Sequence, residues 1–84
     1  MPDLSVRVLL FATLRDAVGR GELTVNLPAE ATGADLLDRL SAEHDAVARH
    51  RPAVRLAVNQ RYVPTDTALA DGDEVALITP VSGG

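Results

Sequence analysis

The last two residues, Gly83 and Gly84, are the ones whose type and position could do chemistry. Glycine has no Cβ, so a Gly-Gly end can enter a channel where any larger residue would clash. The carboxylate of Gly84 would then be the reactive group, once activation gives it a good leaving group. Pro80 stiffens the start of this end, and residues 80–84 can extend at most ~17 Å. The sequence therefore predicts a tail that reaches into the active site of another protein.

The rest of the chain carries no pattern typical of a catalytic or metal site. His44 and His50 are six residues apart, a spacing that does not place them on one helix face, and neither belongs to a metal-ligand motif such as H-x-x-x-H. Asp71 and Asp73 flank Gly72 and are expected to form a turn. The chain has no Cys, so it offers no thiolate and no disulfide. We expect no metal ion and no stably bound cofactor.

Length and charge restrict the class of protein. A chain of 84 residues makes one small domain, and 46% hydrophobic residues are enough for a core. The net charge of -4 argues against nucleic-acid binding and favours a basic protein surface as partner. The first seven residues lack a signal-peptide pattern, and no apolar run could span a membrane. We expect a cytoplasmic protein with protein partners and no nucleic-acid or membrane partner.

The first third of the chain predicts strand, helix and strand. Residues 5–11 carry apolar side chains on both faces, which indicates a central strand. Residues 13–18 predict a short helix with Thr13 as its N-cap and Gly19 at its C-terminal end. Residues 22–27 alternate with period two, as a half-buried strand does.

The middle of the chain predicts the main helix. Thr32 and Asp35 have the spacing of a capping box, and an apolar stripe follows at helical spacing. The stripe consists of Leu36, Leu37 and Leu40. We expect this helix to end near His44. Residues 45–52 predict either a frayed continuation of the helix or a loop.

The last third predicts three strands, at residues 54–58, 61–63 and 74–79. Asn59 and Gln60 form a two-residue turn between the first two. One mixed sheet with one main helix across one face satisfies the whole order.

This order is the α+β arrangement of the β-grasp, or ubiquitin-like, fold. We expect the β-grasp domain to span residues 1–81. Residues 82–84 are expected to form a flexible Gly-Gly tail, because nothing in them can pack.

Three segments carry motifs that can be compared with a known family. Residues 10–19 contain FATLRDAVG, residues 57–60 are AVNQ, and the end of the chain contains DGDEVA and then PVSGG. They resemble the FA-x-x-R-x-x-x-G opening, the VN turn and the DGDEVA…PPVSGG closing signature of the molybdopterin synthase small subunit, the MoaD family. The likeness runs from end to end. Thr79 stands where the family usually has a first proline, and Leu77-Ile78 stand where aromatic residues are frequent.

The resemblance implies a sulfur carrier. An ATP-dependent, E1-like adenylyltransferase would adenylate the carboxylate of Gly84, and a sulfurtransferase would supply the sulfur that converts it to a thiocarboxylate. The Gly83-Gly84 end would then enter the large subunit of molybdopterin synthase and give its sulfur to cyclic pyranopterin monophosphate, in molybdenum cofactor biosynthesis. The chain would be the non-catalytic, sulfur-donating subunit, and ATP would be used by the activating enzyme.

Candidate contacts with these partners lie near the tail. Phe11 and Ile78 are expected on strand faces that a single helix leaves uncovered, where they could form a hydrophobic docking patch. For Phe11, packing in the core is an equal alternative. The patch would continue into Pro80, Val81 and Ser82. The candidate polar contacts at its rim are Arg15, Arg61 and Asp73.

Other functions fit the same features. A sulfur carrier for thiamin or cysteine biosynthesis shares the fold and the Gly-Gly end, although the closing motif favours the molybdopterin branch. A ubiquitin-like modifier would use the same activated carboxylate and would leave covalent adducts on target proteins. A plain interaction module would tolerate the loss of Gly84.

Overall fold

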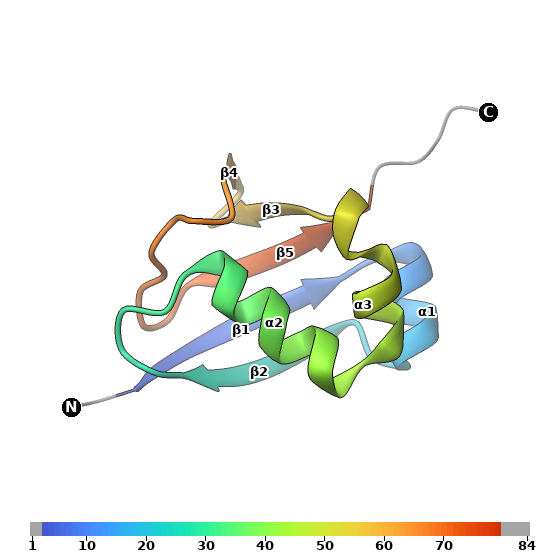
Figure 1. Cartoon of the computed structure of the whole chain (residues 1–84), viewed down its shortest axis with the longest axis horizontal. Coiled ribbons are helices and arrows are strands. Elements are labelled where there is room, and N and C mark those ends of the chain that lie inside the picture. The colour runs from blue at the N-terminus through green and yellow to red at the C-terminus, as the bar shows by residue number, and fades with distance from the viewer. Residues whose placement is uncertain (1–2, 80–84) are drawn as a thin grey trace.

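The computed structural model describes residues 3–79, which form a five-stranded sheet with helices over one face (Figure 1). The elements are β1 (Leu4–Leu10), α1 (Ala12–Val18), β2 (Glu22–Leu27), α2 (Gly33–Glu43), α3 (Asp45–His50), the 3-10 turn η1 (Arg51–Ala53), β3 (Arg55–Val58), β4 (Arg61–Val63) and β5 (Glu74–Ile78). This arrangement confirms the predicted β-grasp fold. The predicted boundary between residues 81 and 82, and the tail behind it, lie outside the described residues.

The sheet places the first and last strands side by side. Its order is β2-β1-β5-β3-β4, and β1 and β5 are parallel whereas all other neighbours are antiparallel. Because β1 and β5 run in the same direction, their C-terminal ends lie side by side, close to α1 (Figure 1). This end of the sheet is called its C-terminal edge below. The chain that follows β5 therefore leaves from the edge where β1 turns into α1.

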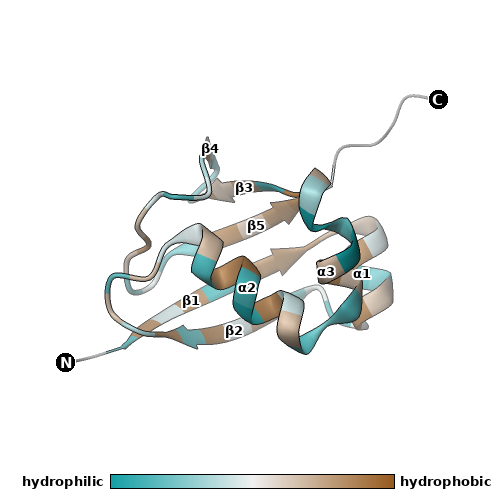
Figure 2. Cartoon of the chain, viewed as in Figure 1, coloured by the Kyte–Doolittle hydropathy of each residue, from teal (hydrophilic) through white to brown (hydrophobic). Residues whose placement is uncertain are grey.

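The core lies between the sheet and the α2–α3 layer. Alternate residues of β1 and β5 are buried in it, and α2 supplies its apolar stripe, which is the pattern expected of an amphipathic helix on a sheet. Figure 2 shows that β1 and β5 are rich in hydrophobic residues and that α2 alternates between hydrophobic and hydrophilic ones. The fully buried side chains include Val6, Val8, Leu10, Leu36, Leu37, Leu40, Val75 and Leu77. Each such side chain contributes about 1.5–3 kcal/mol of hydrophobic stabilisation.

The start of α2 is fixed by the predicted capping box. The Thr32 hydroxyl accepts a hydrogen bond from the Asp35 N–H at 3.3 Å, and the Asp35 carboxylate accepts one from the Thr32 N–H at 2.9 Å. These bonds satisfy donors that a helix start otherwise leaves without partners. The helix ends at Glu43 with His44 as C-cap, as the sequence predicted.

The prediction for residues 45–52 was wrong. The segment is neither a frayed end of α2 nor a loop, because α3 and η1 occupy it. His44 has extended backbone angles that stop α2, and a new helix begins directly after it. Val47 is fully buried and Ala46 is also in the core, so two adjacent apolar residues anchor a helix whose other residues are mostly polar or small.

The junction between β1 and α1 also differs from the prediction. The first strand ends at Leu10, and Phe11, not Thr13, is the N-cap of α1. Ala12 has a φ of 47°, in the left-handed region that costs an L-residue about 1–2 kcal/mol. This sharp turn comes directly after Phe11, which keeps extended backbone angles but lies beyond the last paired residue of β1. The C-terminal end of α1 is as predicted, with Gly19 at a φ of 86° and its N–H bonded to the Arg15 carbonyl.

The turn at Asn59 and Gln60 is confirmed, and both residues have positive φ, as such hairpin turns require. The Asn59 side chain ties this turn to the start of β5. Its Nδ2 donates to Asp73 Oδ1 at 2.9 Å, and its Oδ1 accepts from the Glu74 N–H at 3.1 Å. The positions of β3, β4 and β5 are therefore fixed relative to one another.

Replacing Gly33 with Ala is expected to destabilise the fold by about 1–3 kcal/mol, as overpacking does. A Cβ on Gly33 would lie 2.4 Å from Leu56 Cδ1 and 3.0 Å from the Thr65 carbonyl oxygen. Urea unfolding would measure the loss. Gly21→Ala is the matched control, since its Cβ would meet only the movable Arg15 side chain, at 3.3 Å or more, and a backbone oxygen at ordinary contact distance. Equal losses in the two variants would contradict this account of Gly33.

Candidate functional site

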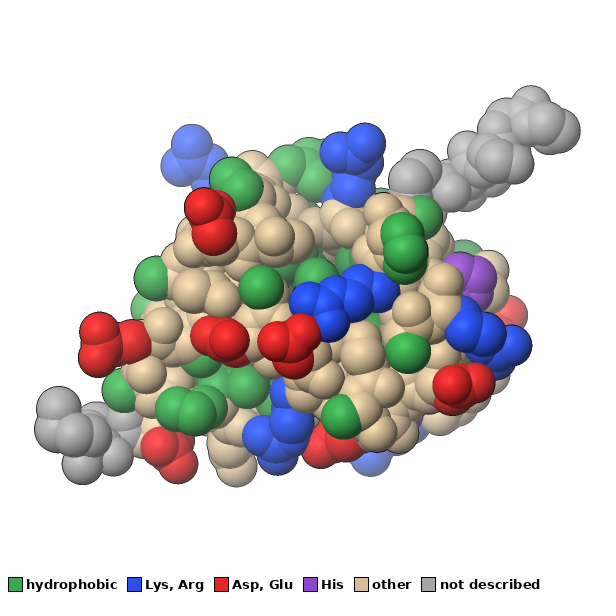
Figure 3. All heavy atoms as spheres, in the orientation of Figure 1, with side chains coloured by type: hydrophobic (Ala, Val, Ile, Leu, Met, Phe, Trp, Pro, Cys, Tyr) green, Lys and Arg blue, Asp and Glu red, His purple; other side chains and the backbone are tan. Residues whose placement is uncertain are grey.

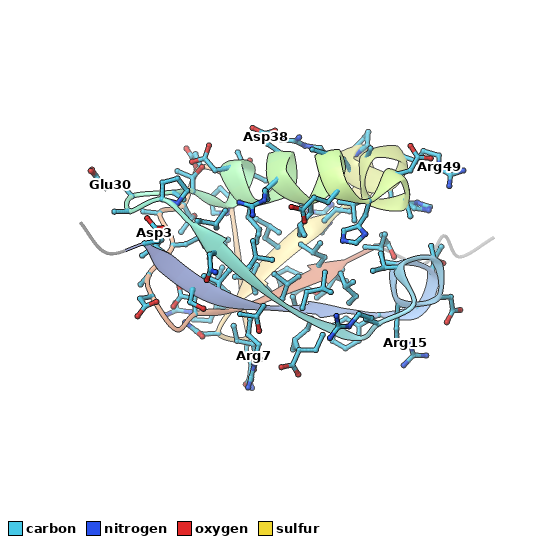
Figure 4. All side chains as sticks on the ribbon, turned by 90° about the horizontal axis from the view of Figure 1, so that it is seen from below. Asp3, Arg7, Arg15, Glu30, Asp38 and Arg49 are labelled. Atoms are coloured by element: carbon cyan, nitrogen blue, oxygen red, sulfur yellow. The ribbon has the colours of Figure 1, made fainter. Side chains whose placement is uncertain are left out.

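One face of the sheet is left without helices. Figure 4 shows α2 and α3 on one side of the sheet and Arg7 on the other, while Asp38 and Arg49 lie in the helix layer. Strand residues alternate between faces, so the neighbours of the buried residues point to this open side. The helix-covered face, by contrast, presents charged side chains across its surface (Figure 3).

The strand register brings one row of side chains together across the open face. Leu9 of β1 is opposite Ala76 of β5, Ala76 is opposite Ala57 of β3, and Ala57 is opposite Tyr62 of β4. The row is thus large at both ends and small in the middle. Two alanines on adjacent strands leave space where bulkier side chains would stand.

This row forms the floor of a hollow on the open face. The residues that line it are Leu9, Phe11, Ala57, Gln60, Tyr62, Glu74, Ala76 and Ile78. Its walls include Phe11, which is 48% exposed, and Tyr62, which is 68% exposed. Among the described residues these are the two large hydrophobic side chains with high exposure. Exposed aromatic groups around an apolar depression are typical of a surface that binds another protein.

The hollow lies at the end of the sheet where β5, the last described strand, finishes. Leu10 and Leu77 are opposite each other in the parallel pair, so Phe11 and Ile78 follow them at the same edge. Ile78 is the last residue of β5 and also lines the hollow. A protein that covers the hollow would therefore also meet the chain as it leaves the sheet.

Charged residues close the other end of the open face. Arg7 Nη2 donates to Glu74 Oε2 at 2.6 Å, and Arg7 Nε lies 3.7 Å from Glu22 Oε2. The guanidinium is thus held between two carboxylates from the neighbouring strands. Such exposed pairs contribute little stability, but they keep this end of the face polar.

The structure brings two predicted contact residues, Phe11 and Ile78, into one hollow. Phe11 is exposed, which removes the core alternative and keeps the exposed one, and it follows β1 instead of belonging to the strand, which corrects the predicted strand end. The other predicted site residues, Pro80, Val81, Ser82, Gly83 and Gly84, lie outside the described residues.

The three rim candidates have different positions. Asp73 holds the turn before β5, because its carboxylate accepts from the Ala70 N–H and from Asn59. Arg61 alternates with Tyr62 and therefore points away from the hollow. Arg15 is exposed on α1, with Asp16 at 4.0 Å, and lies below the sheet with Arg7 in Figure 4.

Sequence reasoning missed most of the hollow. Leu9, Tyr62 and the two alanines were not named, although the alternation of Tyr62 with Arg61 and Val63 indicated an exposed aromatic residue on a short strand. The other titratable candidates have structural positions. His44 joins α2 to α3, and Asp71 accepts from the Ser5 N–H at 2.7 Å.

Within residues 3–79, no group of three or more His, Cys, Asp or Glu side chains is placed to hold a metal ion. Nor does this part of the chain contain a helix with the length and apolar character needed to cross a membrane.

The chain was also compared with known protein families, relatives and solved structures. Residues 8–84 match the ThiS family. The molybdopterin synthase sulfur carrier subunit of Chlamydomonas reinhardtii is 43% identical over 83 residues, which cover 96% of this chain and 100% of that protein.

Solved structures with the same fold extend the comparison. The small archaeal modifier protein 1 of Haloferax volcanii has a TM-score of 0.83 and 29% identity, over 93% of this chain and 99% of that one. A chain from the complex of subunits 1 and 2 of molybdopterin-converting factor from Helicobacter pylori has a TM-score of 0.70 and 23% identity, over 96% and 100%. At 23% identity, this last match shows only that the two chains share a fold.

Proposed function

The chain belongs to the ThiS family, and we propose on that basis that it is the sulfur carrier subunit of molybdopterin synthase. The relatives of that name cover nearly the whole chain. The observation that carries the proposal is the position of the hollow, which lies at the sheet edge from which residues 80–84 continue. A docking surface beside the departing tail is what a carrier needs to present its end to an active site.

The proposed chemistry takes place at the carboxylate of Gly84. An activating enzyme joins this carboxylate to the AMP part of ATP and releases pyrophosphate. A sulfide equivalent from a sulfurtransferase then displaces AMP and leaves a thiocarboxylate. Adenylation is needed because a carboxylate oxygen is a poor leaving group, whereas AMP is a good one.

The loaded tail then acts as a sulfur donor in the large subunit. Each loaded chain gives one sulfur and regains one oxygen at the Gly84 carbonyl carbon, so two such transfers build the dithiolene of molybdopterin from cyclic pyranopterin monophosphate and return the Gly84 carboxylates. Gly83 and Gly84 suit this role because a chain without Cβ atoms can pass through a narrow channel. The large subunit supplies substrate binding and proton transfer, so this chain is the donating rather than the catalytic subunit.

The hollow serves docking in this proposal. Phe11, Tyr62 and Ile78 become buried against the large subunit or against the activating enzyme, and their burial supplies most of the binding free energy. Both partners need access to the tail, so both are expected to cover the same end of the sheet. ATP is consumed on the activating enzyme, this chain holds no cofactor of its own, and the reactions take place in the cytoplasm.

A reconstitution tests this function. The chain would be prepared with a chemically installed C-terminal thiocarboxylate and mixed with the large subunit and cyclic pyranopterin monophosphate. Molybdopterin should form in proportion to the thiocarboxylate added, and the same chain with an ordinary carboxylate should form none. Release of sulfur without molybdopterin would reject this pathway and favour another acceptor.

A ubiquitin-like modifier is the second candidate, because the small archaeal modifier protein 1 of Haloferax volcanii shares 29% identity and the fold. A modifier would be joined through Gly84 to amine groups of other proteins. Mass spectrometry of trypsin-digested cell proteins should then find lysines that carry residues 62–84 of this chain, because Arg61 is its last basic residue. If such adducts are absent from cells that make molybdopterin, the modifier function is rejected and the carrier function is the candidate that stands.

A further inference from the structure

Arg55 is a charged residue near the hollow. The proposed function gives the hollow a role in docking but gives Arg55 none. It is the first residue of β3 and lies opposite Ile78, the last residue of β5. The next residue, Leu56, is buried in the core, so Arg55 points to the open face together with Ala57. Its side chain therefore starts on the face of the hollow, from the residue paired with the last residue of β5.

Within residues 3–79, Arg55 has no carboxylate within ion-pair distance. The six ion pairs of this part of the chain involve other arginines. Arg7, on the same face, differs because Glu22 and Glu74 already neutralise it. Arg55 lines a second depression with Tyr62 and Pro64, so apolar groups adjoin its charge.

Docking over the hollow would take Arg55 out of water. Tyr62 lines both the hollow and the depression that Arg55 lines, and Ile78 is paired with Arg55, so a partner that covers Tyr62 and Ile78 also meets Arg55. A charge that loses its water and gains no partner opposes binding strongly. Arginine presents a planar set of donors that matches a carboxylate with two parallel hydrogen bonds.

We infer that the partner docking over the hollow places an Asp or Glu carboxylate against Arg55, beside the departing tail. The inference rests on the proposed function, since it concerns the partners named there. It adds a local acidic contact to the basic partner surface that the net charge of -4 leads us to expect. At this point of the interface the partner is acidic, and Arg55 helps to determine which partner binds and in which orientation.

Arg61 provides a matched control. It is also exposed, lies on the neighbouring strand and has no carboxylate partner within residues 3–79. It alternates with Tyr62 and therefore points to the opposite face of the sheet. Arg55→Glu and Arg61→Glu change the net charge equally, so any difference between them reports position rather than total charge.

The test is calorimetric titration of the full chain into the large subunit of molybdopterin synthase from the same genome. Arg55→Glu should raise Kd by about tenfold or more, as the loss of a buried charge pair does, and Arg61→Glu should leave it within about twofold. Arg55→Lys should restore part of the affinity. Raising the salt concentration should weaken the wild type more than Arg55→Gln, because the neutral variant has lost the ion pair.

The outcomes separate this inference from the function on which it rests. Equal Kd values for Arg55→Glu and Arg61→Glu, with both variants as stable to heat as the wild type, would overturn the role of Arg55 and leave the carrier function standing. Failure of the wild type itself to bind the large subunit would overturn the proposed function, and this inference with it. An Arg55-dependent dimer of the isolated chain would show that a second copy, not the large subunit, supplies the carboxylate.

Discussion

Deleting Gly84 is expected to abolish molybdopterin formation while the fold stays intact. The proposed reaction forms and breaks a bond at the Gly84 carbonyl carbon, and the described sheet and helices end before residue 80. The shortened chain should therefore unfold at the same urea concentration as the full chain. Coupled assay with the activating enzyme, a sulfur donor and the large subunit should give no product above background.

A second preparation shows which step is lost. If a thiocarboxylate is installed chemically on Gly83 of the shortened chain, the activation step is bypassed. The assay then tests only whether the shorter tail reaches the active site of the large subunit. A tail that is one residue short ends up to ~3.4 Å too early, so transfer should still be strongly impaired. Full activity of the shortened chain in the coupled assay would mean that Gly84 is not the reacting residue.

Replacing Phe11 with Asp is expected to weaken docking by roughly 30- to 1,000-fold without loss of stability. Truncation of a central aromatic contact in an interface costs about 2–4 kcal/mol. Phe11 is the N-cap of α1 and makes no side-chain cap bond, whereas Asp is among the preferred N-cap residues. The variant should therefore be as stable as the wild type, or more stable by up to about 1 kcal/mol. Calorimetric titration into the large subunit measures the first effect and urea unfolding the second.

Phe11→Asn is the matched variant, because it keeps the cap preference and removes the new charge. Both variants should bind weakly if the aromatic ring is the anchor. Wild-type affinity in both would show that the partner does not cover the hollow. Weak binding by Asp alone would indicate that repulsion, rather than the lost ring, is responsible.

Local patterns predicted the elements that depend on neighbouring residues. The strand at residues 22–27 has the predicted bounds, since strict alternation is a strong signal. The capping box at Thr32 and Asp35 and the positive-φ turn at Asn59 and Gln60 also agree, because each is a preference of a few adjacent residues.

Elements that depend on distant contacts could not be predicted in this way. The helix α3 has little apolar periodicity and forms because Val47 reaches the core. The end of β1 is set by the left-handed conformation of Ala12, which no residue preference favours. This is why Phe11 was assigned to the strand and left undecided between core and surface.

The hollow was hidden for a similar reason. Its floor joins Ala57 and Ala76, which come from strands separated by much of the last third of the chain and meet only through the register of β3 and β5. A sequence shows that an alanine is small, but not that two of them are adjacent on an open face. The same strand pairing places Tyr62 opposite Ala57 and Arg55 opposite Ile78, and neither neighbour can be read from the sequence.

The most direct test of the central claim is the intact mass of the chain after incubation with ATP, the E1-like activating enzyme and a sulfur donor. We predict a gain equal to the exchange of one oxygen for one sulfur, located at Gly84 by fragmentation and absent when ATP is withheld. An unchanged mass, with partner enzymes that activate another carrier in the same mixture, would contradict the assignment of this chain as a sulfur carrier.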